Sequence, residues 1–149
     1  MQRVDKAQLL ARADILMMQV PMTPDTHHFL GEAEFAAMRD GAIVVNTGRG
    51  PTIDNRALHG ALVRGKVAAA GLDDPEEEPA KRAQWNPADN PLFTLPNVLV
   101  TPHAAYYSEE SIRSAREIAA DEVARVLTGR RPNNPVNAVD LLDRLARQN

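Results

Sequence analysis

The 149-residue sequence predicts an α/β protein built on a doubly wound parallel sheet of about four strands. Three observations lead to this prediction. Short apolar runs alternate with amphipathic helical segments from the N-terminus to about residue 128. The runs are nearly unbroken, which is typical of strands in a parallel sheet that helices cover on both faces. Polar or charged residues follow each run, at the strand ends where sheets of this kind bind their ligands.

The chain begins with a predicted helix and strand. Residues 4–12 form a short helix, with Leu9 and Leu10 on its apolar side. Residues 15–20 form the first apolar run, and Pro21 ends it because proline has no N–H to donate to a sheet.

A second helix and strand follow. Residues 32–38 are helical, and Gly41 stands where a helix often stops. The run at 42–46 is rich in β-branched side chains, which favours a strand.

The third helix spans residues 55–64, with Asp54 as a plausible N-cap and Gly65 as its end. Its apolar stripe consists of Leu58, Ala61 and Leu62. Residues 67–72 make the third strand, and residues 74–95 resemble a loop dense in Pro, Glu and Asn.

The fourth strand, at 97–101, precedes the longest helix, which Ser108 caps and which Gly129 and Pro132 end. We expect this helix to bury a stripe made of Ile112, Ala115, Ile118 or Ala119, Val123 and Val126. Residues 133–149 are a C-terminal tail that the pattern does not place.

Composition excludes several classes of protein. The chain is 44% hydrophobic and 25% charged, as in packed globular domains. It has no apolar run near the roughly 20 residues of a membrane helix, no secretory signal and no cysteine. With 17 basic and 20 acidic residues interspersed, it lacks the basic stripe of a nucleic-acid-binding protein. We therefore expect a cytoplasmic protein with neither membrane nor nucleic acid as a direct partner.

Three side chains at the strand ends suggest a reaction. Arg49 lies between two glycines that let a ligand approach the backbone, and its guanidinium can hold a carboxylate by two hydrogen bonds. His103 can donate or accept a proton, and Glu78 can stabilise its imidazolium. A carboxylate clamp and a proton donor suit reduction of a 2-keto acid. The electrons must then come from a cofactor.

Each residue also has a simpler interpretation. Arg49 can be a surface ion pair, and Glu78 part of a solvated acidic loop. We interpret His27, His28 and His59 as structural or exposed, because no carboxylate stands near them at metal-ligand spacing. The joint occurrence of Arg49, Asp73 and His103 after successive strands favours function.

The sequence resembles the D-isomer-specific 2-hydroxyacid dehydrogenases over roughly residues 6–137. The resemblance lies in the order and separation of short stretches: LARADI (10–15), PMTPDT (21–26), MRDGA (38–42), NTGRG (46–50), GLD (71–73), EP (78–79), NV (97–98) and TPH (101–103). It implies that residues 1–132 are the C-terminal part of a Rossmann-type NAD-binding domain that carries the catalytic residues.

The resemblance also implies roles. Arg49 would bind the substrate carboxylate and keto oxygen, and His103 would be the acid/base with Glu78 as its partner, while Asp73 would lie by the nicotinamide. The residues implied to line the cofactor are Val20, Pro21, Thr26, Thr47, Gly48, Arg49, Asp73, His103 and Ala105. The cofactor is NAD, with NADP left open, and the implied partners are a small 2-keto or 2-hydroxy acid and a second copy of the chain. No metal is implied.

Within the family, the residues from His103 to Glu109 resemble most the C-terminal-binding-protein branch, in which an aromatic side chain helps to select the substrate. Tyr106 stands at that position, and Asp74 replaces a usually apolar residue. Two alternatives to a dehydrogenase remain open: an NAD-sensing, corepressor-like binding protein, and a truncated, non-functional fragment.

The family's Gly-x-Gly-x-x-Gly turn, which cradles the cofactor pyrophosphate, does not occur in these residues. We therefore expect a partial sheet without the glycine-rich half. Such a sheet would expose an apolar edge, so the chain alone would be inactive, and either marginally stable or paired with another chain.

Overall fold

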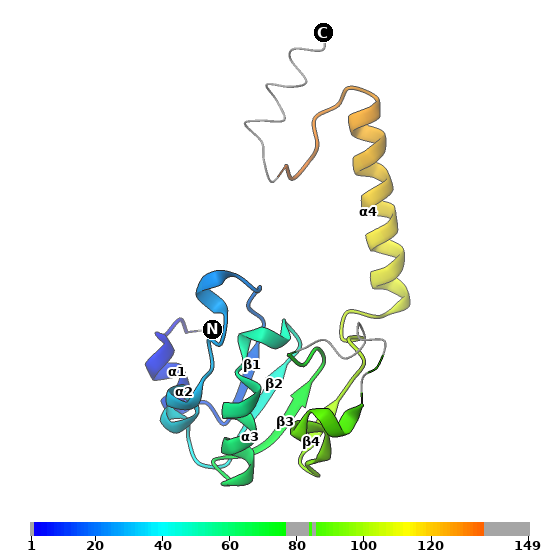
Figure 1. The fold of residues 1–149 in the computed structure, drawn as a ribbon. Coiled ribbons are helices and arrows are strands. Elements are labelled where there is room, and N and C mark those ends of the chain that lie inside the picture. The colour runs from blue at the N-terminus through cyan, green and yellow to red at the C-terminus, as the bar shows by residue number, and fades with distance from the viewer. Residues whose placement is uncertain (1, 77–83, 85, 136–149) are drawn as a thin grey trace. The chain divides into compact units, whose positions relative to one another are not determined.

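A computed structural model describes residues 2–76, 84 and 86–135 of the chain. The chain divides into two compact units, Met1–Ala105 and Tyr106–Asn149. The first unit contains a four-stranded parallel sheet in the order β1-β2-β3-β4, so that strands consecutive in the chain lie side by side (Figure 1). This arrangement confirms the predicted α/β fold of Rossmann type.

The strands are β1 (Ile15–Met18), β2 (Ala42–Asn46), β3 (Val67–Leu72) and β4 (Val98–Val100). The helices of the first unit are α1 (Lys6–Arg12), α2 (Glu32–Ala37) and α3 (Asn55–Val63). Strands β2 and β3 have the predicted bounds. Strand β1 ends two residues earlier than predicted, because its last paired residue, Met18, lies opposite the last residue of β2.

Carboxylates cap the start of two helices, and one of them was predicted. The Asp54 carboxylate accepts the N–H of Ala57 and begins α3, as expected. Asp5, which was not predicted as a cap, accepts the N–H of Gln8, so α1 begins at Lys6 rather than at residue 4. The segment predicted as a loop at 74–95 contains two short 3-10 turns, η4 (Pro87–Asp89) and η5 (Pro91–Thr94). Leu92 of η5 is fully buried, so this part of the loop belongs to the core.

One face of the sheet and the three helices share a single hydrophobic core. Strand residues such as Leu16 and Val44 alternate with exposed neighbours along β1 and β2. The predicted stripe of α3 is buried in this core, as expected: Leu58, Ala61 and Leu62. Side chains on the opposite face of the sheet are exposed in the first unit, which differs from the predicted cover on both faces: Ile15, Met17, Ile43 and Leu99.

The second unit holds helix α4 (Glu109–Leu127), which Ser108 caps by accepting the N–H of Ser111. The cap was predicted, but the predicted buried stripe was wrong: α4 has no buried residue, and Ile118 is 64% exposed. A helical period shows only which side of a helix can be buried. Burial also needs a partner, and α4 is the only helix or strand within residues 106–135.

Candidate active site

The carboxyl ends of the four parallel strands lie along one edge of the sheet. The predicted site residues of the first unit follow these ends: Val20, Pro21 and Thr26 after β1, Thr47, Gly48 and Arg49 after β2, Asp73 after β3, and His103 and Ala105 after β4. The topology therefore places residues up to 85 positions apart in sequence on the same edge. Arg49 and His103 lie at the same edge without a hydrogen bond or ion pair between these two described residues.

The Asp73 carboxylate anchors the segment that carries His103. It is only 4% exposed and accepts three hydrogen bonds from this segment. One oxygen accepts the Thr101 hydroxyl at 2.5 Å and the Ala104 N–H at 2.8 Å, and the other accepts the Ala105 N–H at 2.9 Å. His103 has a positive φ of 53°, and its N–H donates to the Asp73 carbonyl at 2.7 Å. The histidine is thus presented on a turn that Asp73 shapes.

These contacts also decide the charge of Asp73. Burial, the largest single effect, raises the pKa of this carboxyl because it disfavours the charged form. The hydrogen bonds from Thr101, Ala105 and Ala104, together with the charge of His103, outweigh it, so the pKa of Asp73 is lower than usual. Asp73 is therefore a buried carboxylate that stays ionised at neutral pH.

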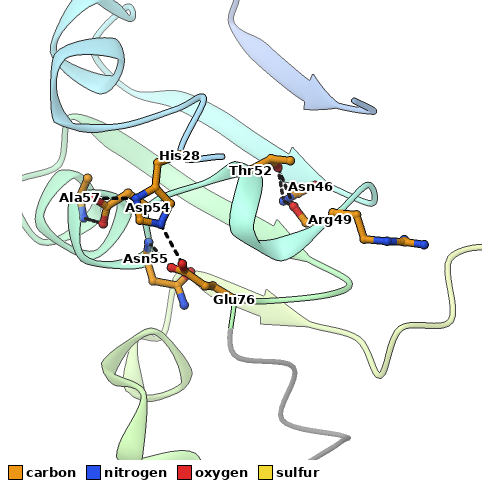
Figure 2. Close-up of polar contacts among 8 residues, drawn as sticks. All are labelled: His28, Asn46, Arg49, Thr52, Asp54, Asn55, Ala57 and Glu76. Carbon is orange, nitrogen blue, oxygen red and sulfur yellow. Dashed lines mark hydrogen bonds and ion pairs between the residues drawn. The ribbon is translucent and has the colours of Figure 1, made fainter. Parts of the chain in front are cut away.

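The loop that carries Arg49 is shaped by two buried polar residues, Asn46 and Thr52 (Figure 2). The Thr52 hydroxyl and the Asn46 amide both donate to the carbonyl of Arg49, at 2.6 and 3.1 Å. The Asn46 side-chain oxygen accepts the N–H of Gly48 at 3.0 Å. The Arg49 side chain is exposed, and its guanidinium donates to the Gly48 carbonyl at 3.0 Å. The backbone of this loop is held, while the guanidinium is accessible to a ligand.

The segments after β2 and β3 meet at Gly50. A Cβ atom on this glycine would lie 2.4 Å from the backbone nitrogen of Glu76 and 2.4 Å from the carbonyl carbon of Pro75. Real Cβ atoms do not approach backbone so closely, so this contact requires glycine. The requirement is steric, which differs from the ligand access that the sequence suggested for the glycines beside Arg49.

Asp74 places a second buried carboxylate next to His103. One of its oxygens lies 3.7 Å from Nδ1 of His103, and the residue is 5% exposed. Its other oxygen has no hydrogen-bond partner in the described part of the chain. The sequence singled out Asp74 only as a departure from the family pattern. Glu78, the predicted partner of His103, lies outside the described residues.

The segment after β1 forms a compact turn at the same edge. The Thr26 hydroxyl donates to the carbonyl of Pro21 at 2.7 Å and accepts the N–H of Thr23 at 2.7 Å. Across to β2, the amide of Gln19 donates to the hydroxyl of Thr47 at 2.5 Å. These side chains tie the ends of β1 and β2 together next to the Arg49 loop.

His28 contacts carboxylates that its neighbours along the sequence do not supply. Its Nε2 lies 2.7 Å from a carboxylate oxygen of Glu76, and its Nδ1 lies 3.8 Å from Asp54 (Figure 2). Glu76 is 48 positions away in sequence, which is why local spacing missed it. The expectation that ligand-binding residues follow parallel strands could have found it, because His28 and Glu76 lie in loops after β1 and β3 at the same edge.

Comparison with known proteins agrees with the family resemblance of the sequence. Residues 1–105 match the family model described as "D-isomer specific 2-hydroxyacid dehydrogenase, NAD binding domain". The chain is 44% identical over 133 residues to a D-3-phosphoglycerate dehydrogenase of Methanocaldococcus jannaschii, covering 89% of this chain and 24% of that protein. It is 41% identical to a glyoxylate/hydroxypyruvate reductase B of Citrobacter koseri, covering 89% of this chain and 39% of that protein.

A similar solved structure is that of D-lactate dehydrogenase with NAD⁺ from Lactobacillus jensenii. It superposes with a TM-score of 0.80 at 33% identity, over 90% of this chain and 42% of that one. The chain thus spans between about a quarter and two fifths of the length of these relatives. None of the described helices has the length and apolar character needed to cross a membrane.

Proposed function

Because the chain belongs to the D-isomer-specific 2-hydroxyacid dehydrogenase family, we propose that it is part of an enzyme that interconverts a 2-keto acid and a D-2-hydroxy acid. The observation that carries this proposal is the parallel sheet, which brings a guanidinium, a fixed carboxylate and an imidazole to one edge. The relatives named above suggest hydroxypyruvate, glyoxylate, pyruvate and 3-phosphohydroxypyruvate as first candidates for the substrate.

The residues at this edge fit a nicotinamide cofactor. The positions implied to line it after β1 and β2, Val20, Thr47 and Gly48, are half-buried, uncharged and mostly small. A Cβ on Gly48 would already lie 3.1 Å from the carbonyl oxygen of Val20, so the wall here is backbone rather than a protruding side chain. Such a surface suits a flat ring with a polar amide. When bound, the reduced cofactor NADH would supply the hydride that no side chain of the protein can deliver, and NAD⁺ would accept it in the reverse direction.

We assign the chemical work of the protein to two side chains. The exposed guanidinium of Arg49 binds the substrate carboxylate with two parallel hydrogen bonds and orients the neighbouring keto carbon. The imidazole of His103 donates a proton to the keto oxygen during reduction and removes it during oxidation. Asp73 contributes indirectly, since its carboxylate holds the turn that presents His103.

The assay for this proposal follows NADH oxidation by the purified protein with each candidate keto acid, next to a fluorescence titration with NADH alone. We expect His103→Gln to lower kcat by about 100-fold or more, since general acid catalysis contributes about 10²–10⁴-fold. We expect Arg49→Ala to raise KM and to lower kcat/KM. The matched controls are His59→Gln and Arg12→Ala, which should behave like the wild type. Wild-type rates in His103→Gln would refute the proposal.

The proposal includes the assembly and the cellular location of the enzyme. We expect a homodimer in the cytoplasm, in line with the family resemblance, and sedimentation equilibrium of the purified protein measures the assembly directly. Tyr106, which lies exposed in the second unit, is our candidate for substrate selection. Tyr106→Leu should change the ranking of the keto acids by kcat/KM while NADH binding stays the same.

A further inference from the structure

Three side chains that the proposed reaction does not use form a compact cluster of metal-ligand type. His27, His28 and Glu76 each offer one donor atom, and the three donor atoms lie within 4.8 Å of one another. Two of them, Nε2 of His28 and an oxygen of Glu76, are already 2.7 Å apart. Ligands of a tetrahedral zinc ion lie about 3.3 Å apart, given bonds of about 2.0–2.1 Å. Small side-chain movements are therefore enough to bring all three donors to bonding distance.

The backbone explains how two adjacent histidines can serve one site. Neighbouring side chains on an extended chain point in opposite directions. His28 instead has a φ of 48°, in the left-handed region, and its N–H is held by the carbonyl of Pro51 at 2.8 Å. The turn places the rings of His27 and His28 face to face, with centroids 4.0 Å apart and planes 25° from parallel. Both imidazoles are therefore presented on the same side.

Further contacts fix the orientation of the donors. The Asp54 carboxylate lies 3.8 Å from Nδ1 of His28, the ring nitrogen that faces away from Glu76, and Asp54 is itself held as the cap of helix α3 (Figure 2). Metal-binding histidines usually donate their other ring N–H to a carboxylate, and Asp54 is close enough to accept it after a small movement of the ring. The second oxygen of Glu76 accepts the N–H of Asn55 at 3.4 Å, which leaves the first oxygen directed at His28.

The chemistry of the donors selects the ion. Two imidazoles and one carboxylate suit zinc and its transition-metal neighbours, whereas magnesium and calcium prefer oxygen donors alone. Neutral histidines with the carboxylates of Glu76 and Asp54 bring two negative charges to a divalent cation. We propose that His27, His28 and Glu76 bind one Zn²⁺-type ion, with a water molecule as the fourth ligand.

Metal binding at this cluster would connect two loops of the proposed active site. Glu76 belongs to the segment that packs against Gly50, next to Arg49. His27 and His28 belong to the turn after β1. An ion that joins them would hold both segments in place. We therefore expect the bound metal to raise the stability of the fold.

The test is a zinc titration of the purified protein in competition with a chromophoric chelator, followed by the visible spectrum of the Co²⁺ form. We expect one ion per chain with micromolar or tighter affinity, and tetrahedral d–d bands with Co²⁺. His27→Gln is the first variant, because His27 is exposed and we expect its replacement to leave the fold intact. It should weaken binding at least tenfold, as should Glu76→Gln, while His59→Gln should bind zinc like the wild type.

Thermal unfolding gives an independent readout that does not depend on dehydrogenase activity. Zinc should raise the Tm of the wild type and of His59→Gln, and raise that of His27→Gln clearly less at the same zinc concentration, with EDTA reversing the rise. The proposal is overturned if the wild type binds no stoichiometric zinc at micromolar concentrations. It is equally overturned if His27→Gln and Glu76→Gln bind as tightly as the wild type, or if His59→Gln loses binding to the same extent.

Discussion

Replacing Asp73 by asparagine should destabilise the fold at neutral pH and have little effect in acid. The asparagine oxygen can still accept the hydrogen bonds from Thr101 and Ala104, but its NH₂ group then faces the N–H of Ala105. One hydrogen bond to a charged acceptor is lost, and two weaken from charged to neutral strength. With about 1.5–3 kcal/mol for a charged bond and about 0.5–1.5 for a neutral one, the gross loss is about 4–5 kcal/mol. Relief from burying a charge offsets part of this loss, so we expect Asp73→Asn to cost about 3 kcal/mol of unfolding free energy.

The pH dependence follows from the lowered pKa of Asp73 in the folded state. A depressed pKa means that the unfolded chain takes up a proton first as the pH falls. The stabilisation is therefore complete above the unfolded value of about 3.9 and is lost as the pH falls through the lower folded value. The difference between wild type and Asp73→Asn should be constant from pH 7 to about pH 5 and shrink below pH 4.

Urea unfolding followed by far-UV circular dichroism, at several pH values from 7 to 3.5, measures this difference. The matched control is Asp40→Asn. The pKa of Asp40 is also lowered, by the hydrogen bond and charge of Lys66, but its side chain is 88% exposed. Its effect should be small and should disappear in 0.5 M salt, whereas the Asp73 effect should persist. A change of less than 0.5 kcal/mol in Asp73→Asn at pH 7 would refute the anchoring role of this carboxylate, as would a difference that does not shrink in acid.

Three further substitutions test the packing and the loops. Phe35→Ala removes a side chain that is 1% exposed and should cost about 3–5 kcal/mol in urea unfolding. Gly50→Ala should cost about 1–3 kcal/mol or more, because its Cβ would lie 2.4 Å from backbone atoms. Gly71→Ala is its control, since there a Cβ meets only a valine side chain at 3.9 Å, and equal losses in the two alanine variants would contradict the steric argument. Thr52→Val removes a 2.6 Å hydrogen bond to the Arg49 carbonyl and should raise KM for the keto acid without changing NADH affinity; an unchanged KM would show that the loop is held otherwise.

The sequence predicted the sheet well because its strands carry their own signal. The β-branched run predicted as a strand has the same bounds as the observed β2, and Asp54 caps the start of α3 as predicted. The errors occur where a second element decides the outcome. Strand β1 ends where its pairing with β2 ends, and the apolar side of α4 stays exposed because its unit offers no described element to cover it. Periodicity reports the character of a segment, not the presence of its partner.

The candidate active site shows the same difference between what a segment indicates by itself and what depends on a second element. Arg49, Asp73 and His103 could be selected from sequence, because the rule that ligands bind after parallel strands needs only the order of the strands. The contacts that hold them could not. Asn46 and Thr52 resemble ordinary strand-end residues, and only the structure shows that both donate to the carbonyl of Arg49.

Spacing along the chain gave His28 no carboxylate neighbour, and the structure supplies one for a reason that applies to parallel sheets in general. A search for ligand spacing along the chain assumes that one helix or turn supplies all the ligands. In a parallel sheet, each crossover returns the chain to the same edge, so residues in loops after different strands become neighbours. His28 and Glu76 are 48 positions apart and 2.7 Å apart for this reason. The rule that locates the proposed catalytic residues therefore also predicts where unassigned histidines and carboxylates can meet, and the zinc titration of His27→Gln tests it at a position that the dehydrogenase reaction does not require.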